Sequence, residues 1–284
     1  MQNIIISIIG GDIRHIYLAN LLIDRVKEVK VFGLNHVKLD PRVNRYDNVI
    51  EAINKADIVI GPIPFSTNDK TIKASLYNKD IYIEELFISM TNKQKLISSN
   101  FSETATEMAT NYKINIIDLN SFNEFAILNA IATAEGAIKE AIEASDISLH
   151  GSEVLVLGFG RCAKVLADKL QGIRAKVSVT ARKKEDLAYI EAYGYTPIDF
   201  KKMNSTLDKY DYIFNSIPKL VLDESMLCKV KKDCIVIDIA SSPGGVDFYA
   251  AEKLDVKAIL SLGIPGKVSP KTSAEIMWRI ISDL

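Results

Sequence analysis

Residues with metal-binding or redox chemistry are scarce in this sequence of 284 residues, which contains three cysteines and three histidines. Cys162, Cys228 and Cys234 do not have the spacing of a metal-ligand set, and their odd number argues against a disulfide framework. The histidines include no closely spaced pair, so we expect no structural or catalytic zinc site. Free thiols are typical of a reducing compartment, and we therefore expect a cytoplasmic location.

The sequence also lacks a strong net charge and a long apolar run. The 35 basic and 36 acidic residues give a formal net charge of −1, so no overall field favours nucleic acid or an acidic membrane surface. No apolar stretch is long enough to cross a bilayer. The start, MQNIIISIIGG, has no basic segment and no small-residue cleavage site, which predicts a buried first strand and not a signal peptide. We expect no nucleic-acid or membrane partner, and any anionic ligand must be held by local groups.

Two blocks of alternating strand and helix patterns fill the chain, which is long enough for two α/β domains. In the first block, strands are predicted at residues 4–9, 28–32, 57–61, 81–83 and 114–117, and helices at 14–25, 49–55, 93–98 and 103–112. In the second, strands are predicted at 153–157, 176–180, 195–198, 212–215, 234–239 and 257–260, and helices at 162–170 and 271–284. The strands are continuously apolar, which is typical of a parallel sheet covered by helices on both faces.

A long helix is predicted between the blocks, because residues 121–145 carry small and apolar side chains at helical spacing and no proline. We therefore predict an α/β protein with two domains. Residues 1–122 form a flavodoxin-like or Rossmann-like parallel sheet that binds substrate or partner, and residues 151–270 form an NAD(P)-binding Rossmann domain. Residues 123–150 form the linking helix, and residues 271–284 form a C-terminal helix that crosses back to the first domain.

A glycine pattern joins the strand at 153–157 to the helix that follows it. The residues of this turn are Gly158, Phe159, Gly160, Arg161, Cys162 and Ala163. Gly158 permits the tight turn, Gly160 lets the backbone approach a pyrophosphate, and Ala163 lets the helix pack closely on the sheet. Phosphates then lie at a helix N-terminus, where N–H groups and the helix dipole favour negative charge. The alternative is an ordinary strand-to-helix turn whose glycines serve packing alone.

The end of the next strand indicates which dinucleotide binds. NAD enzymes usually carry an acidic residue about 20 residues after the glycines, where it binds the ribose 2′-hydroxyl. Here the chain has Thr180, Arg182 and Lys183, and no carboxylate before Glu185. Arg182 can bind a 2′-phosphate with its planar fork and Thr180 can donate a hydroxyl, so we predict NADP in preference to NAD. Alternatively, Arg182 and Lys183 are a solvated helix start.

Three later strand ends carry small and polar residues, and ligands of such sheets lie beyond the carboxyl ends of the strands. These loops are residues 215–218, 240–245 and 263–267, and each of them alone is more often just a turn. Together they predict a cleft for ribose and nicotinamide. The expected cofactor contacts are Gly158, Phe159, Gly160, Arg161, Thr180, Arg182, Lys183, Asn215, Ser216, Ile217, Pro218, Ala240, Ser241 and Pro265.

Over its whole length the chain resembles the A-subunit family of dipicolinate synthase. The resemblance is carried by GGDIRHIYLANLL near the start, TAEGAI at 133–138, VLGFGR at 156–161, IFNSIPKLVL at 213–222, IDIASSPGGVDF at 237–248 and SLGIPGKVSPKTSAEI at 261–276. The last two motifs are the most specific, because many nicotinamide dehydrogenases share the glycine turn alone. The family often has proline where this chain has Ala132, which changes the local helix start before Thr133 and Glu135.

The resemblance implies NADP-dependent oxidation of a dihydrodipicolinate-type ring, which forms by dehydration of 4-hydroxy-tetrahydrodipicolinate. The product is pyridine-2,6-dicarboxylate, made during bacterial sporulation. It further implies a partner, the flavoprotein-like B subunit, and a place in the sporulating mother cell. We also expect a homo-oligomer.

A substrate with two carboxylates needs donors at both ends and a face open to the nicotinamide. The donors that we expect at the interdomain cleft are Arg14, Ser66, Thr133 and Thr272. Lys267 follows a Pro265-Gly266 pair that fixes a turn, and Glu135 could serve as a base or orient Arg14, so we predict catalytic roles for both. Surface positions are the alternative for Arg14, Lys267 and Glu135. His15 lies in an apolar helix pattern and is more typical of a satisfied histidine than of the proton acceptor.

Two other functions fit parts of the pattern. A small α/β domain, a long helix and a Rossmann domain also describe 2-hydroxyacid and alanine dehydrogenases. Those enzymes usually carry a histidine or arginine in the cofactor-domain loops, and here no histidine follows His150. A non-catalytic protein that binds NADP and regulates its partner is the other alternative.

Overall fold

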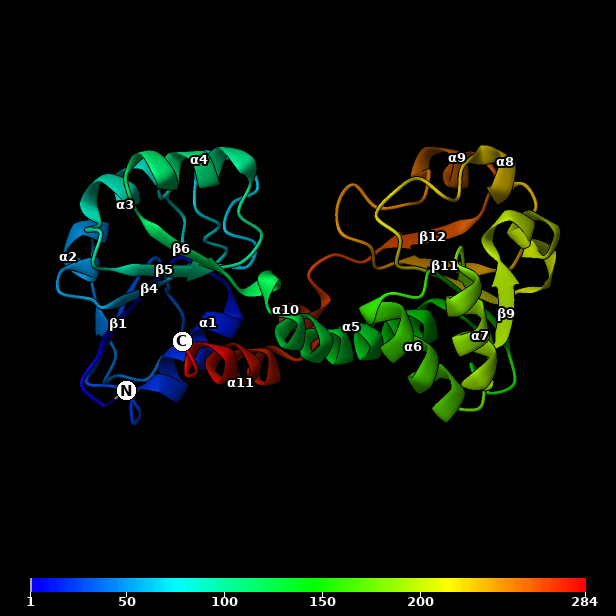
Figure 1. Ribbon diagram of the computed structural model, residues 1–284, viewed down its shortest axis with the longest axis horizontal. Helices are drawn as coiled ribbons and strands as arrows, with labels where there is room; N and C mark the ends of the chain where they lie inside the picture. Colours follow the sequence, from blue (N-terminus) through cyan, green and yellow to red (C-terminus); the bar gives the residue numbers. More distant parts are fainter. Residues whose placement is uncertain (1) are drawn as a thin grey trace. The chain divides into compact units, whose positions relative to one another are not determined.

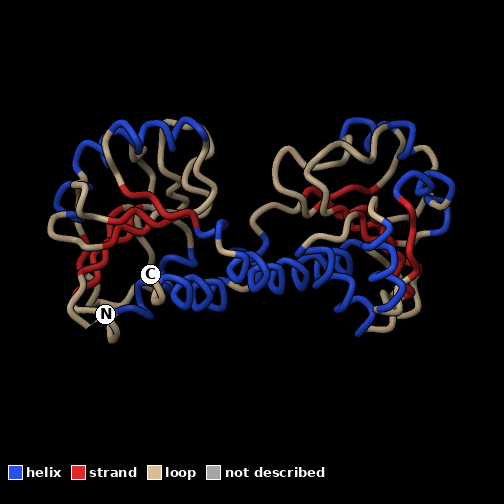
Figure 2. The backbone as a smooth tube through the Cα atoms, in the orientation of Figure 1, coloured by secondary structure: helices blue, strands red, loops and turns tan. Residues whose placement is uncertain are grey.

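The computed structural model describes residues 2–284, which divide into two compact units (Figure 1). Unit 1 contains the chain up to Ala126 together with Ser269–Leu284, and unit 2 contains Ile127–Val268. Each unit is built around one six-stranded sheet with helices against it, drawn in red and blue in Figure 2. The division falls inside the predicted linking segment 123–150, so most of that segment belongs to unit 2.

Unit 1 begins with the predicted buried strand. Its strands are β1 Ile5–Ile9, β2 Glu28–Phe32, β3 Asn44–Arg45, β4 Ile58–Ile60, β5 Lys95–Ser98 and β6 Asn115–Asp118. Its helices are α1 Ile13–Leu22, α2 Val49–Ile53, α3 Ile83–Ser89, α4 Glu103–Asn111, the short 3-10 helix η1 Leu119–Ser121 and α11 Pro270–Ile281. Helices α2, α3 and α4 lie on one face of the sheet, and α1 and α11 lie on the other (Figure 1).

The strand order of unit 1 is β3-β2-β1-β4-β5-β6, with all neighbours parallel. A Rossmann-type sheet has this order, whereas a flavodoxin-like sheet has the order 2-1-3-4-5. The predicted parallel α/β fold is confirmed, and of the two alternatives the Rossmann-like one is found. The loops after β1 and β4 meet at the carboxyl edge, where the order of strands reverses.

Two local predictions in unit 1 are wrong. Residues 93–98, predicted as a helix, contain β5, which pairs with β4 on one side and β6 on the other. So short a segment carries little helical periodicity, and pairing with two neighbouring strands decides its conformation. Residues 81–83, predicted as a strand, lead into α3, and Tyr82 forms only an isolated bridge with Thr71.

Unit 2 repeats the architecture. Its strands are β7 Glu153–Leu157, β8 Lys176–Ala181, β9 Thr196–Asp199, β10 Tyr212–Asn215, β11 Ile235–Asp238 and β12 Lys257–Leu260. Its helices are α6 Arg161–Gly172, α7 Lys184–Ala192, α8 Glu224–Leu227, α9 Phe248–Lys253, α10 Ile264–Val268 and the 3-10 helices η2 Phe200–Ser205 and η3 Leu207–Lys209. The order β12-β11-β10-β7-β8-β9, all parallel, is again that of a Rossmann sheet.

The predicted long helix is α5, Asn123–Ala144, whose later turns pack on the sheet of unit 2. Ala134, Ala137 and Ala141 are buried in that core. Gly136 lies where α10 crosses, because a Cβ there would overlap Cγ2 of Ile264. None of the helices in residues 2–284 combines the length and the apolar character needed to cross a membrane.

Candidate functional site

The turn after β7 has a backbone that requires glycine at its first position. Gly158 has φ of +94°, a conformation that L side chains rarely adopt. A Cβ there would also lie 3.0 Å from Ser216 Oγ and 3.1 Å from Ile217 Cγ1. The backbone N–H of Gly158 donates to Oγ1 of Thr180 over 2.9 Å. The end of β8 and the loop after β10 therefore hold this turn in shape.

Gly160 is different, because the fold does not require it. It precedes α6 with φ −81° and ψ −170°, which is extended backbone that any residue adopts. A Cβ at this position would meet no heavy atom within 4 Å. Gly160 is the N-cap residue and provides no side chain to cap α6, and the start of a helix favours an anion. Glycine here leaves open space beside a helix N-terminus, which is what a pyrophosphate needs.

The corresponding turn of unit 1 is filled by the protein itself. A Cβ at Gly10 would lie 2.9 Å from the carbonyl oxygen of Lys73, and one at Gly11 would lie 2.5 Å from the ring of His15. The carboxylate of Asp12 caps α1 and accepts from the N–H of Arg14 over 3.0 Å. An anionic ligand would meet this carboxylate at the helix N-terminus. Of the two Rossmann turns, the one in unit 2 is therefore the one open to phosphate.

Asp12 anchors a polar cluster in unit 1. Arg14 is buried, with Nη2 2.6 Å from the Asp12 carboxylate and 2.7 Å from the Ile63 carbonyl oxygen. Nδ1 of His15 accepts from the Asp12 N–H over 3.2 Å, and Nε2 lies 3.2 Å from the Gly61 carbonyl oxygen, so Nε2 carries the proton. Burial opposes ionisation of Asp12, but the hydrogen bonds and positive charge of Arg14 outweigh it and hold the pKa of the carboxyl well below its usual range.

Two sequence alternatives are settled by this cluster. A surface position for Arg14 is wrong, because its side chain is 5% exposed. His15 is a satisfied core residue, fully buried with both ring nitrogens engaged. A role for Arg14 in holding a substrate carboxylate stays a prediction.

The end of β8 presents a cation at the edge of the sheet. Ala181 pairs with Asp199 of β9, so Arg182 and Phe200 follow in register, and the guanidinium carbon lies 4.8 Å from the centre of the Phe200 ring. Arg182 is exposed, whereas Thr180 is fully buried beneath the glycine turn. Thr180 thus fixes the turn, and Arg182 is the group that can reach a ribose phosphate. Lys183 lies in an exposed pair, 3.5 Å from Glu185.

A buried pair organises the loops after β10 and β11. Nδ2 of Asn215 donates to Oδ1 of Asp238 over 2.8 Å, and both residues are fully buried. Asp238 also accepts from the N–H of Ala240 over 3.1 Å and from that of Gly245 over 2.7 Å. A Cβ at Gly245 would lie 2.5 Å from Asn215 Nδ2, so the loop closes on the pair without side-chain bulk. The sequence analysis did not predict a role for Asp238, although it lies within the strand predicted at 234–239 and ends β11.

The other predicted contacts around the turn differ in accessibility. Ser216 donates from Oγ to the Leu157 carbonyl oxygen over 2.8 Å, which ties the loop after β10 to β7. Pro218 and Ser241 are exposed, and Ala240 is buried. Asn215 is also fully buried, and contact of Asn215 and Ala240 with a cofactor stays a prediction.

Comparison with known proteins agrees with this geometry. Residues 5–120 match the family model of the N-terminal domain of the dipicolinate synthase A subunit, and residues 125–246 match that of the D-isomer specific 2-hydroxyacid dehydrogenase NAD binding domain. The dipicolinate synthase A subunit of Bacillus subtilis (strain 168) is 30% identical over 281 residues, which are 98% of this chain and 95% of that protein. The chain belongs to the A-subunit family of dipicolinate synthase.

Solved structures of this family have the same fold. The dipicolinate synthase A subunit of Bacillus halodurans is 30% identical, with a TM-score of 0.92 and coverage of 100% of this chain and 98% of that one. The corresponding structure from Bacillus subtilis is 28% identical, with a TM-score of 0.89 and coverage of 100% and 96%. The matched NAD-binding domain includes the open turn at Gly160. The protein is an oxidoreductase with a site for a nicotinamide cofactor.

The predicted catalytic residues have local surroundings that the sequence did not show. Glu135 is half exposed on α5 and pairs with Lys169 of α6 over 2.9 Å. Lys267 is exposed, and the Pro265-Gly266 pair before it lies within the short helix α10 and not in a turn. Both catalytic roles stay predictions.

The predicted substrate donors other than Arg14 lie on three different elements. Oγ of Ser66 accepts from the N–H groups of Asn68 and Asp69 over 3.2 and 3.0 Å in a tight turn. Thr133 donates back to the Asn129 carbonyl oxygen over 3.0 Å along α5. Thr272 is exposed near the start of α11. Each hydroxyl is already engaged or at the surface, and their binding of substrate stays a prediction.

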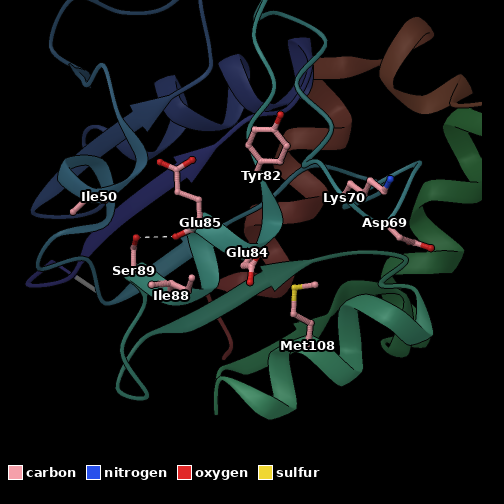
Figure 3. A pocket seen from close by; sticks show the side chains of 9 residues that line it. All are labelled: Ile50, Asp69, Lys70, Tyr82, Glu84, Glu85, Ile88, Ser89 and Met108. Carbon is pink, nitrogen blue, oxygen red and sulfur yellow. Dashed lines mark hydrogen bonds between the residues drawn. The ribbon is translucent and has the colours of Figure 1, made fainter.

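A groove of about 550 Å³ lies elsewhere on unit 1, over α2, α3 and α4 (Figure 3). The residues that line it are Ile50, Asp69, Lys70, Tyr82, Glu84, Glu85, Ile88, Ser89 and Met108. None of the predicted substrate or cofactor residues is among them. Its acidic rim at Glu84 and Glu85 is unsuited to a dicarboxylate, so this groove is separate from the proposed chemistry.

Proposed function

We propose that this protein is the A component of a dipicolinate synthase that oxidises a dihydrodipicolinate-type ring to pyridine-2,6-dicarboxylate, with NADP as hydride acceptor. The proposal is carried by the open turn at Gly160, in a chain of this family. The backbone conformation of Gly160 does not require glycine, so we attribute the glycine at this position to a ligand that needs the space beside it.

The reaction removes two hydrogens from the ring. One leaves with its electron pair as hydride, and the other leaves as a proton to a base, so the dihydropyridine becomes an aromatic pyridine and NADP⁺ becomes NADPH. A bound nicotinamide supplies the hydride acceptor, and aromatisation makes the step strongly downhill. The protein must bind and orient both molecules and accept the proton.

Backbone groups at Gly158 and Gly160 would hold the pyrophosphate at the start of α6. The loops held in shape by Asn215 and Asp238 would receive the ribose and nicotinamide, with contacts at Phe159, Arg161, Ser216, Ile217, Pro218, Ala240, Ser241 and Pro265. The absence of a carboxylate at the end of β8 and the exposed guanidinium of Arg182 support NADP in preference to NAD.

For the substrate we propose Arg14 as a carboxylate ligand. Its contacts with Asp12 and Ile63 engage Nε and Nη2, so Nη1 is the nitrogen through which it can hold a substrate oxygen. Hydroxyls of Ser66, Thr133 and Thr272 are further donors. Glu135, ion-paired with Lys169, and Lys267 are the proposed proton-transfer groups.

The relatives from both Bacillus species are named as one lettered component of a synthase, which supports a partner chain. For that partner we propose a flavoprotein-like B subunit. We further propose that the protein forms a homo-oligomer and acts in the cytoplasm of the mother cell during sporulation. The absence of a strong net charge is consistent with small-molecule binding.

The test is turnover by the full chain together with its partner chain. With 4-hydroxy-tetrahydrodipicolinate and NADP⁺, we expect NADPH absorbance to rise in step with dipicolinate measured by mass spectrometry. Binding of NADP without turnover, with the partner present, would indicate the non-catalytic alternative. Turnover of 2-keto acids instead would indicate the 2-hydroxyacid or alanine dehydrogenase alternative.

A further inference from the structure

The aromatic ring beneath Arg182 has no part in the function proposed so far. Phe200 begins η2 directly after β9, and the Arg182 guanidinium lies over its ring at 4.8 Å. This distance is within the range of a cation–π contact. Because β8 and β9 pair in register up to Ala181 and Asp199, strand pairing brings the two residues together.

The ring is fixed from below. Phe200 is half-buried and packs against the core cluster that contains Met203 and Leu207. The carboxylate of Asp199 accepts from the N–H of Lys201 over 2.9 Å and so caps the turn that carries the ring. Phe200 is therefore held by the core and the capped turn, independently of the exposed side chain above it.

The Arg182 guanidinium has no competing carboxylate among the described residues. Within residues 2–284, no carboxylate forms an ion pair with Arg182, whereas the adjacent Lys183 pairs with Glu185. An exposed arginine without such a partner normally samples many rotamers, and ordering it on binding costs free energy. Stacking on Phe200 orders the planar fork before a ligand arrives.

We propose that Phe200 is a positioning residue for cofactor choice, which holds the Arg182 fork for a phosphate monoester on the adenine ribose. This inference rests on the proposed use of NADP. Stacking on Phe200 raises affinity only for a ligand that carries the 2′-phosphate, because NAD offers Arg182 no anion at that place. Phe200 thus acts on the ratio of the two affinities and not on pyrophosphate binding at Gly160.

The experiment is equilibrium titration of the full chain with NADPH and with NADH. In Phe200→Leu we expect the Kd for NADPH to rise about two- to fivefold, the worth of one exposed cation–π contact, while the Kd for NADH is unchanged. Phe200→Tyr keeps the ring face and should restore wild-type affinity. Phe200→Met is a second variant without the ring. If Phe200→Leu does not fold, the Kd values of Phe200→Met for NADPH and NADH test the proposal.

Coupling with Arg182 separates positioning from damage to the fold. Arg182→Ala should weaken NADPH selectively, and Phe200→Leu combined with Arg182→Ala should be no weaker than Arg182→Ala alone. Equal loss of NADPH and NADH in the ring-less variants, or additive loss in the double variant, overturns the inference. If Arg182→Ala itself leaves the ratio of the affinities unchanged, the proposed NADP preference is wrong. If Arg182→Ala is selective and Phe200→Leu is not, only the role of Phe200 fails.

Discussion

Oγ1 of Thr180 accepts a hydrogen bond of 2.9 Å from the backbone N–H of Gly158, and this contact joins the ends of two neighbouring strands. Gly158 is in the left-handed region, so its peptide groups are not paired by the sheet as those of β7 are. The buried hydroxyl of Thr180 satisfies an N–H that the turn would otherwise leave without a partner. The geometry of the phosphate loop therefore depends on the residue type at the end of β8.

Thr180→Val tests this dependence with little change in side-chain volume. It leaves the Gly158 N–H without an acceptor, and we expect a loss of about 1–2 kcal/mol in the free energy of unfolding. NADP and NAD affinities should fall by similar factors, because both need the same turn. Thr180→Ser keeps the hydroxyl and is the control. Selective loss of NADP affinity in Thr180→Val would instead place this hydroxyl on the ribose phosphate.

The two glycines of the turn should respond in opposite ways. A Cβ at Gly160 would meet no heavy atom within 4 Å, so we expect Gly160→Val to remain folded and to lose both NADP and NAD binding. Gly158→Ala forces a Cβ into the left-handed region and should destabilise the protein by about 1–2 kcal/mol. Normal cofactor binding by a folded Gly160→Val protein would show that the open space is not where the pyrophosphate lies.

The parallel sheets could be predicted from the sequence because their strands are short, continuously apolar runs that end at glycine or proline turns. The same pattern failed at residues 93–98, where Leu96 and Ile97 are the apolar core of a four-residue strand that exists only through pairing with β4 and β6. Long-range pairing of this kind leaves no local signal. The spacing of the glycines predicted the turn, but it did not show that the space beside Gly160 is open.

Side-chain networks were the least predictable part of the candidate site. The sequence predicts that Thr180 donates to a ribose phosphate, which stays a prediction, and it did not show that the hydroxyl is buried and bonded to the Gly158 N–H. The direction of a side chain at a strand end depends on the neighbouring turn. The burial of Arg14 was not predicted either. Its guanidinium pairs with Asp12 and donates to the carbonyl oxygen of Ile63, which lies 49 residues further along the chain. Such contacts follow from the fold and not from local spacing.

Asp238 is expected to be a structural requirement of the nicotinamide side of the site. Its carboxylate accepts from Asn215, Ala240 and Gly245, all inside the protein. Asp238→Ala leaves these donors unpaired and should lower the free energy of unfolding by about 3 kcal/mol, whereas Asp238→Asn keeps one acceptor oxygen and should lose less. Urea unfolding measures both. Equal stability of Asp238→Ala and wild type would contradict the assigned network.

Asp12 should make the protein sensitive to acid. Its folded-state pKa lies below the ordinary value of 3.8, so the unfolded chain binds a proton first as the pH falls. The stabilisation is therefore fully present above about pH 5 and declines as the pH falls below 3.8 toward the much lower folded-state value. Asp12→Asn leaves the buried Arg14 without its counter-ion and should cost about 3 kcal/mol at pH 7. The difference from wild type should narrow as the pH approaches 3.

A second Asp-x-Arg pair provides the matched control. Asp40 and Arg42 repeat the spacing of Asp12 and Arg14, with Arg42 Nη2 3.1 Å from the carboxylate, but the Arg42 side chain is 59% exposed. Hydrogen bonds from Arg42 lower the pKa of Asp40 too, yet water screens this pair, so Asp40→Asn should change the urea midpoint little at either pH. If Asp40→Asn and Asp12→Asn gave equal, pH-independent losses, burial of the Asp12 cluster could not be the source of the acid sensitivity. A large effect confined to Asp12→Asn would tie that sensitivity to the filled turn of unit 1.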